Sequence, residues 1–232
     1  MRPVRMAAAF VASAEGSVLV EMGRTRVICT ATVEHRVPRW RECAGAGWVT
    51  AEYGMLPAST GRRTLRPGPG RVNSRATEIG RLIGRTLRAG TDLAALGPNT
   101  VVVDCDVIEA DGGTRTAAIT GGWVALARAV DAARRAGRVP DGRPAVRDQV
   151  VAVSVGVVGG EARLDLCYAE DSAADVDLNV AMTANGRLIE VQATGEKATF
   201  SQAELVRLLQ LARQGCRHLA EVQARARRKR ER

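Results

Sequence analysis

The chain has 232 residues, 46% of them hydrophobic, which is enough to bury the core of one domain. Its apolar runs are too short to span a membrane, and Glu15 with a strand pattern from Ser17 argues against a cleaved signal peptide. The net charge of +9 indicates either a polyanion partner such as nucleic acid or the arginine-rich codon usage of a GC-rich genome. Five scattered cysteines without a Cys-x-x-Cys pair indicate neither a zinc ribbon nor a disulfide framework, and they favour a reducing cytoplasm.

The first part of the chain shows strand and helix patterns in alternation. Two strands are expected to pair as a hairpin across Gly23 and Arg24. A helix is predicted where Ile79, Leu82 and Leu87 recur on one face, and a second helix carries Trp123 in its apolar face. In chain order the predicted elements are a strand over 17–23, a strand over 25–33, an irregular stretch over 58–74, a helix over 75–90, a strand over 100–110 and a helix after residue 113.

A break rich in Pro, Gly and Arg at 137–148 separates a second, strand-rich part. A long helix closes this part, opened by Ser201 and Glu204 as a capping box. The basic residues 224–232 are expected to form a solvated, partly disordered tail. The predicted strands of this part are 150–158, 162–168, 176–183 and 187–194.

Each part of the chain thus offers a sheet and at least one helix. The sequence predicts an α/β (α+β) fold of two packed layers with mixed strands, because a parallel doubly wound fold needs more helices than these patterns supply. We expect a single domain over 1–232 with two halves, at about 1–140 and 149–223.

A glycine pair, Gly112 and Gly113, lies between the strand over 100–110 and the helix that follows it. Backbone N–H groups at a helix start lack partners, and the helix dipole is positive there, so this position suits an anion. Thr114 adds a hydroxyl group, and Arg115 adds a planar fork that matches phosphate oxygens. The segment is interpreted either as an anion-binding loop or as a plain tight turn before a helix.

A second polar cluster lies at 170–180, where Asp175, Asp177 and Asn179 alternate along a predicted strand and so share one face. Asp171 precedes them by about one turn, where a loop can bring it alongside. Grouped carboxylates suit Mg²⁺ or Mn²⁺. The alternative is a set of solvated turn aspartates.

The chain has only two histidines, His35 and His218, and neither has a Ser or Cys in a triad-like setting. A reaction that needs a nucleophile from the protein is therefore poorly supported. A reaction in which a bound anion is itself the nucleophile needs only an arginine and backbone cradle with a metal or an acid. Phosphate attacking a phosphodiester fits this description.

Seven segments, in the right order, resemble the bacterial ribonuclease PH family along nearly the whole chain. They include 47-GWVTAEYGMLP-57 and 103-VDCDVIEADGGTRTAAITG-121. The others are 15–20, 77–89, 152–158, 170–180 and 187–196. The family consists of phosphate-dependent exoribonucleases that trim tRNA 3′ ends, so the resemblance implies an enzyme that releases nucleoside diphosphates and can add nucleotides in reverse.

The resemblance also implies roles for particular residues. It assigns phosphate binding to Arg75 ahead of the Thr-x-Glu-Ile helix and to the loop residues Gly113, Thr114 and Arg115. Two catalytic or metal-binding aspartates fall on Asp171 and Asp177. The implied fold has two pseudo-repeated halves, and the implied assembly is a ring-shaped hexamer built as a trimer of dimers.

The loop over 61–71 carries four arginines without any hydrophobic period, so we expect them to be exposed. The resemblance places this loop near the tRNA body, which makes its arginines candidate RNA-binding residues: Arg62, Arg63, Arg66 and Arg71. An ordinary solvated loop is the alternative. The chain departs from the family pattern at 73–74, where Asn-Ser replaces Gly-Gly, and its first residues align with an Arg-Pro-Val that about ten residues usually precede.

A second function class stays open at this point. A chain of the same fold can be a catalytically silent RNA-binding or scaffold subunit of an exosome-like ring. The retained arginines and aspartates argue for the enzyme.

Overall fold

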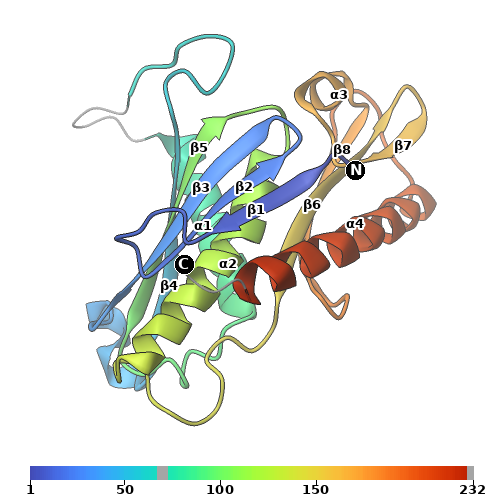
Figure 1. The fold of residues 1–232 in the computed structure, drawn as a ribbon. Helices are drawn as coiled ribbons and strands as arrows, with labels where there is room; N and C mark the ends of the chain where they lie inside the picture. The colour runs from blue at the N-terminus through green and yellow to red at the C-terminus, as the bar shows by residue number, and fades with distance from the viewer. Residues whose placement is uncertain (67–72, 229–232) are drawn as a thin grey trace.

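The computed structural model describes residues 1–66 and 73–228, which form two β-sheets with helices packed between and around them (Figure 1). The first sheet has the strand order β1-β2-β3-β5-β4, and all its neighbouring strands are antiparallel except β4 and β5, which are parallel. A short 3-10 helix, η1 (Arg39–Ala44), precedes β4. The strands are β1 (Val4–Ala8), β2 (Gly16–Met22), β3 (Thr25–Glu34), β4 (Trp48–Met55) and β5 (Thr100–Glu109).

The second sheet is antiparallel throughout, with the order β7-β6-β8-β9. A short helix, α3 (Tyr168–Ala173), connects β7 to β8. The strand β9 ends the sheet, and Leu188 and Val191 on it are exposed. The strands are β6 (Val150–Val158), β7 (Glu161–Leu164), β8 (Val176–Thr183) and β9 (Leu188–Gly195).

Three longer helices, α1 (Ser74–Ala89), α2 (Thr114–Arg135) and α4 (Gln202–Arg228), complete the fold. The predicted apolar face of α1 is buried. The helix α2 differs from the expected one-faced pattern, because 15 of its 22 residues are buried. It lies between the sheets and contacts β2 and β3 on one side and β6 on the other, so it buries apolar side chains all round (Figure 1).

The local signals in the sequence agree well with these elements. The hairpin across Gly23 forms with Val18 opposite Cys29. The capping box also forms, since the Ser201 backbone N–H donates to Glu204 Oε2 at 2.7 Å and the Glu204 N–H donates to Ser201 Oγ at 3.2 Å. The mixed sheet and the two α/β layers confirm the predicted fold class.

Other elements differ from expectation. The strands β1 and β4 and the helix α3 had no predicted counterpart, and the strand expected over 162–168 ends at Leu164. Residues 224–228 are helical instead of a solvated tail, because Ala226 is buried and Arg227 pairs with Asp131 on α2 at 3.0 Å. Residues 229–232 lie outside the described part of the chain. Within the described residues, no helix is long and apolar enough to cross a membrane.

Candidate active site

A cleft of about 670 Å³ opens where one end of the first sheet meets the second sheet. The loop after β5 and the start of α1 form one wall, and α3, β8 and β9 form the other. The side chains and backbone that line it include all six residues predicted for phosphate and metal binding: Arg75, Gly113, Thr114, Arg115, Asp171 and Asp177.

The glycine loop needs its glycines for two reasons. Gly112 and Gly113 have φ values of 76° and 66°, in the left-handed region that other residues rarely adopt. A Cβ on Gly112 would lie 2.5 Å from the carbonyl oxygen of Leu166, so a larger residue would push the loop away from the second sheet. Gly113 is the N-cap of α2, and Thr114 is the first residue of the helix. The Tyr53 hydroxyl donates a hydrogen bond to Thr114 Oγ1 at 2.9 Å.

Two helices begin at this cleft, each with an arginine in its first turn. Arg75 is the second residue of α1, and Arg115 is the second residue of α2. Neither first turn contains an acidic residue, so the positive ends of both helix dipoles are uncompensated there. Asn73 caps α1, since its side chain accepts a hydrogen bond from the Ala76 N–H at 3.0 Å. The wall is therefore suited to an anion.

Arg115 also links the two walls of the cleft. Its Nη1 atom lies 3.4 Å from Gln192 Oε1 on β9 and 3.6 Å from Glu78 Oε1 on α1. The guanidinium is partly buried, with 28% of the side chain exposed, so an anion bound beside it is only partly screened by water.

Two carboxylates form the opposite wall, Asp171 on α3 and Asp177 on β8. Partial burial raises the pKa of the Asp171 carboxyl, and the charges of Arg115 and Arg75 oppose that rise. Burial, and then the charge of Asp171, raises the pKa of Asp177 to about 6. Asp177 Oδ2 accepts a hydrogen bond from Asn179 Nδ2 at 3.1 Å, whereas Oδ1 is buried without a partner in the described chain. A buried carboxylate oxygen of this kind is suited to bind a cation or a proton.

The predicted acidic cluster is only partly assembled. Asp177 and Asn179 line the cleft, as their alternation predicts, but Asp175 does not. It lies just before β8, where its carbonyl accepts from the N–H groups of Glu196 and Lys197 at 2.9 and 3.1 Å. The Asp175 backbone therefore contacts the connection between β9 and α4.

Several residues of the cleft had no role predicted from the sequence. Gln192, Thr194 and Glu196 come from β9 and its end, Ser154 comes from β6, and Tyr168 begins α3. The β9 residues follow from the register, because Asn179 lies opposite Gln192 and Asp177 opposite Thr194. In the sequence, their spacing of two residues within 187–196 already indicated that these side chains share one face of a strand. No local signal marked Ser154.

The arginine loop reaches the cleft at one point. Arg62 lines it, and Arg62, Arg63 and Arg66 are all exposed. Arg71 lies outside the described residues. The loop thus adds positive charge at the opening of the cleft, on the side of β4.

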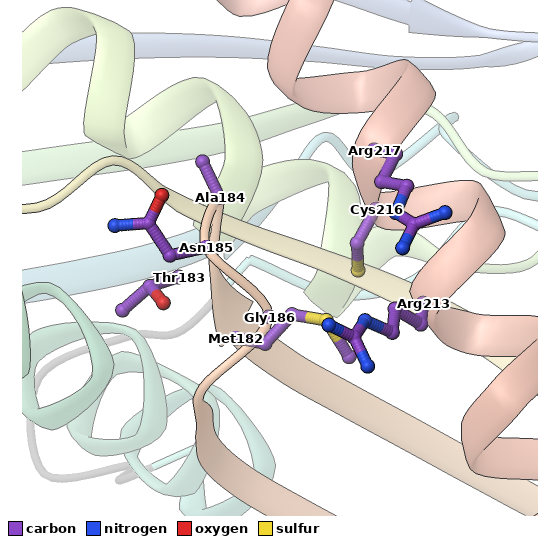
Figure 2. Close-up of a pocket in the computed structure, with 8 residues that line it drawn as sticks. All are labelled: Met182, Thr183, Ala184, Asn185, Gly186, Arg213, Cys216 and Arg217. Carbon is purple, nitrogen blue, oxygen red and sulfur yellow. The ribbon is translucent and has the colours of Figure 1, made fainter.

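A second, smaller hollow of about 190 Å³ lies between the β8–β9 turn and α4 (Figure 2). Arg213 and Arg217 on α4 line it, and a Cβ on Gly186 in the turn would lie 2.9 Å from Arg213 Nε. No carboxylate is among its described lining residues. Burial raises the pKa of the Cys216 thiol beside it to about 12, which keeps that thiol protonated and unreactive.

Comparison with known proteins identifies the family to which the chain is similar. Residues 1–130 match the model described as 3′ exoribonuclease family, domain 1, and residues 148–215 match domain 2 of the same family. A protein of Saccharopolyspora erythraea named Ribonuclease PH is 54% identical over 97% of this chain and 90% of its own length. One of Mycobacterium sp. (strain KMS) with the same name is 56% identical over 97% of this chain and 87% of its own length.

Solved structures show the same fold at low identity. A chain of the Archaeoglobus fulgidus exosome with RNA bound to the active site has a TM-score of 0.78 at 24% identity, over 95% of this chain and 87% of that one. Rice (Oryza sativa) Rrp46 has a TM-score of 0.75 at 18% identity, over 97% of this chain and 94% of that one.

Proposed function

Because the chain belongs to the 3′ exoribonuclease family, we propose that its cleft removes nucleotides from RNA 3′ ends by phosphorolysis. Inorganic phosphate is the co-substrate, and the 3′ ends of tRNA precursors are the substrates. One observation carries this proposal. Two helix N-termini, each with an arginine in its first turn, line the same cleft as a pair of carboxylates.

The phosphate would bind at the two helix starts. Arg75 and Arg115 supply charged donors, and the first turn of α2, from Gly113 and Thr114 onward, supplies backbone N–H groups and a hydroxyl. The uncompensated dipoles attract the anion, and the partial burial of Arg115 strengthens its interaction with phosphate. These donors hold the attacking phosphate against the RNA end, which supplies the proximity that catalysis needs.

The bonds exchanged are the same in both directions of the reaction. An oxygen of hydrogen phosphate forms a bond to the phosphorus of the last phosphodiester, and the bond from that phosphorus to the 3′ oxygen of the preceding nucleotide breaks. The terminal nucleotide leaves as a nucleoside diphosphate. The proton of hydrogen phosphate balances the new 3′ hydroxyl, and the reverse exchange adds a nucleotide.

Asp171 and Asp177 would hold a divalent cation, Mg²⁺ or Mn²⁺. The buried, partnerless Asp177 Oδ1 supports this assignment, because a cation would satisfy it. No group of three or more His, Cys, Asp or Glu side chains gathers among the described residues, but Mg²⁺ in phosphoryl-transfer sites commonly uses one or two carboxylates together with substrate phosphates. When bound, the cation would neutralise charge that develops on the phosphodiester and on the leaving oxygen.

The arginine loop would bind the body of the tRNA. Arg62 lies at the cleft, and Arg63 and Arg66 extend the exposed positive charge away from it. Arg71 is assigned to the same role from the sequence alone. Such contacts to backbone phosphates position RNA without reading its sequence.

We also propose that six copies assemble as a ring, a trimer of dimers, in the cytoplasm. The family resemblance supports the ring, and the exposed apolar residues Leu188 and Val191 on the edge strand β9 are suited to an interface. Five free cysteines support a reducing compartment. Native mass measurement tests the assembly, and a stable monomer would contradict it.

Incubation with a 3′-extended tRNA and Mg²⁺ tests the reaction itself. We expect nucleoside diphosphates, released only when inorganic phosphate is added. Nucleoside monophosphates released without phosphate would contradict phosphorolysis. RNA binding without any release would favour the silent, scaffold-type subunit, against which the complete set of cleft residues argues.

A further inference from the structure

Arg2 lies at the junction of the two sheets, beside the glycine loop. Although β1 belongs to the first sheet, the N-terminus lies near the second sheet (Figure 1), where Arg2 contacts Asp165 just after β7. The Arg2 side chain is only 15% exposed. Its position therefore brings a mostly buried guanidinium beside the glycine loop that lines the cleft.

The guanidinium contacts both sides of the junction. On the side of the second sheet, Arg2 Nη2 and Nε donate to the two oxygens of Asp165 at 2.6 and 3.1 Å, and the Arg2 backbone N–H donates to Oδ2 at 2.9 Å. On the side of the first sheet, Nη1 donates to the carbonyl oxygen of Asp111 at 2.5 Å. A Cβ on Gly113 would lie 3.2 Å from Nη2, so the guanidinium packs directly behind the phosphate-binding loop.

Arg2 donates to both carboxylate oxygens of Asp165. The Asp165 side chain is fully buried, and its backbone adopts a left-handed φ of 63°, which Asp tolerates better than most residues other than glycine. The Asp165 N–H donates to the Ser154 carbonyl at 2.7 Å, and the next N–H, of Leu166, donates to Ser154 Oγ at 3.1 Å. The segment then enters α3, which carries Asp171.

The loop on the other side is held by hydrogen bonds at Asp111 and Gly112. Thr25 Oγ1 donates to the Gly112 carbonyl at 2.7 Å and accepts from the Asp111 N–H at 2.9 Å. Arg2 binds the Asp111 carbonyl, and the Tyr168 N–H donates to Asp111 Oδ1 at 3.3 Å. The loop and the segment leading to α3 therefore share Arg2 as a common partner.

We infer that Arg2 is a positioning residue, which sets the phosphate-binding loop at a fixed distance from the carboxylates Asp171 and Asp177. The inference rests on the proposed function. Arg2 does not reach the reacting atoms, because it is not among the described residues that line the cleft and each of its side-chain nitrogens donates to Asp165 or Asp111. Its effect passes through the loop. Loss of Arg2 should therefore weaken phosphate binding more than RNA binding, which extends over a wider surface.

Two variants test this without leaving a buried charge unpaired. Arg2→Lys keeps the charge but loses the fork that joins Asp165 to Asp111. The double variant Arg2→Gln, Asp165→Asn replaces the ion pair with a neutral one. In both we expect the KM for phosphate to rise about 10- to 100-fold, as for misplacement of a reactant by about 1 Å, while the KM for RNA changes by less than about twofold.

Calorimetric titration with inorganic phosphate, without RNA, measures the same effect independently of turnover. It separates this inference from the proposed reaction, since phosphate-dependent release of nucleoside diphosphates by the unaltered protein tests the latter. Arg227→Lys is the matched control, because Arg227 also links the two parts of the fold through a fork to Asp131 but lies on α4, away from the cleft. We expect its phosphate KM to be unchanged.

The positioning role has clear contrary outcomes. Folded Arg2 variants with unchanged phosphate affinity would overturn it. Equal rises in both KM values, or a loss of activity that only follows the folded fraction by circular dichroism, would show a general structural role instead. Loss of folding in both variants would make Arg2 a folding residue and would equally overturn the inference.

Discussion

The cleft and the smaller hollow are both lined by arginines, yet they differ in where those arginines lie and in the acidic groups beside them. In the cleft, Arg75 and Arg115 lie in the first turns of α1 and α2. In the smaller hollow, Arg213 and Arg217 lie in the middle of α4 (Figure 2). A helix dipole acts only over the first and last turns, so the second pair receives no support from the backbone.

The acidic groups differ as well. The cleft contains Asp171 and Asp177, whose pKa values are raised by burial, whereas no carboxylate is among the described residues that line the smaller hollow. Arginine content therefore does not mark a site in a chain this basic. Helix starts and partly buried carboxylates in the same cavity are what distinguish the cleft from the smaller hollow.

The largest expected effect comes from the carboxylate that only the cleft has. Asp177→Asn should lower turnover by about 10³-fold or more, because a carboxamide is a poor ligand for Mg²⁺ and the ion contributes several kcal/mol. Release of nucleoside diphosphates at saturating phosphate measures this. Asp175→Asn is the control, since Asp175 lies outside the cleft, and near-normal activity of the Asp177 variant would contradict the metal assignment.

The next largest effect is expected from the arginines of the cleft compared with those of the smaller hollow. Arg115→Ala and Arg75→Ala should each cost about 2–4 kcal/mol of transition-state stabilisation, since each removes charge-assisted hydrogen bonds to the attacking phosphate. The ratio kcat/KM for phosphate should fall accordingly, by about 30- to 1000-fold. Arg213→Ala in the smaller hollow should leave it unchanged. An equal effect of all three would mean that net charge alone decides phosphate binding.

The pH dependence of turnover tests the role of Asp177, a carboxylate with no counterpart among the described residues that line the smaller hollow. With a pKa of about 6, this carboxylate becomes protonated as the pH falls below 6, and turnover should fall with it at saturating phosphate and RNA. Asp177→Glu, if active, should shift the midpoint. A rate that stays flat down to pH 5 would show that the ionised form of Asp177 is not required.

The ionised Asp177 carboxylate should also lower the free energy of unfolding at neutral pH. The pKa of Asp177 in the folded state lies above the usual value of 3.8, so the folded state binds the proton more tightly than the unfolded state does. The stability that comes from this proton is present at low pH and is lost as the pH rises through 6. At pH 7.5, Asp177→Asn should therefore stabilise the fold by about 1–2 kcal/mol, after a discount for its partial exposure. Thermal unfolding measures this, and the gain should vanish at pH 4.

The arginine loop gives the smallest effect on chemistry. Replacing Arg62, Arg63 and Arg66 with alanine should weaken tRNA processing and reduce the salt slope of binding by about one unit for each RNA phosphate that an arginine neutralises. Cleavage of a short oligonucleotide should change little, because it reaches only the cleft. Equal losses on both substrates would place the loop in support of the active site, and no loss on either would return it to an ordinary solvated loop.

Much of the fold followed from local pattern. The hairpin across Gly23, the helix α1 and the capping box of α4 were predictable, because turn residues, helical periodicity and caps act over a few neighbouring residues. The glycine pair before α2 was predictable for the same reason, and both glycines adopt the left-handed φ that such a turn requires, while anion binding there stays a prediction. Arg75 was assigned only through the family resemblance.

The sequence by itself therefore predicted most of the elements, a candidate anion-binding loop and the excess of arginine. Only the tertiary structure decided which of those arginines share a cavity with Asp171 and Asp177, and that Asp175 does not. It also decided that Arg2 pairs with Asp165, 163 residues along the chain. The physical reason is that burial, pKa shifts and contacts across the sheets depend on packing between distant segments, which no local pattern encodes.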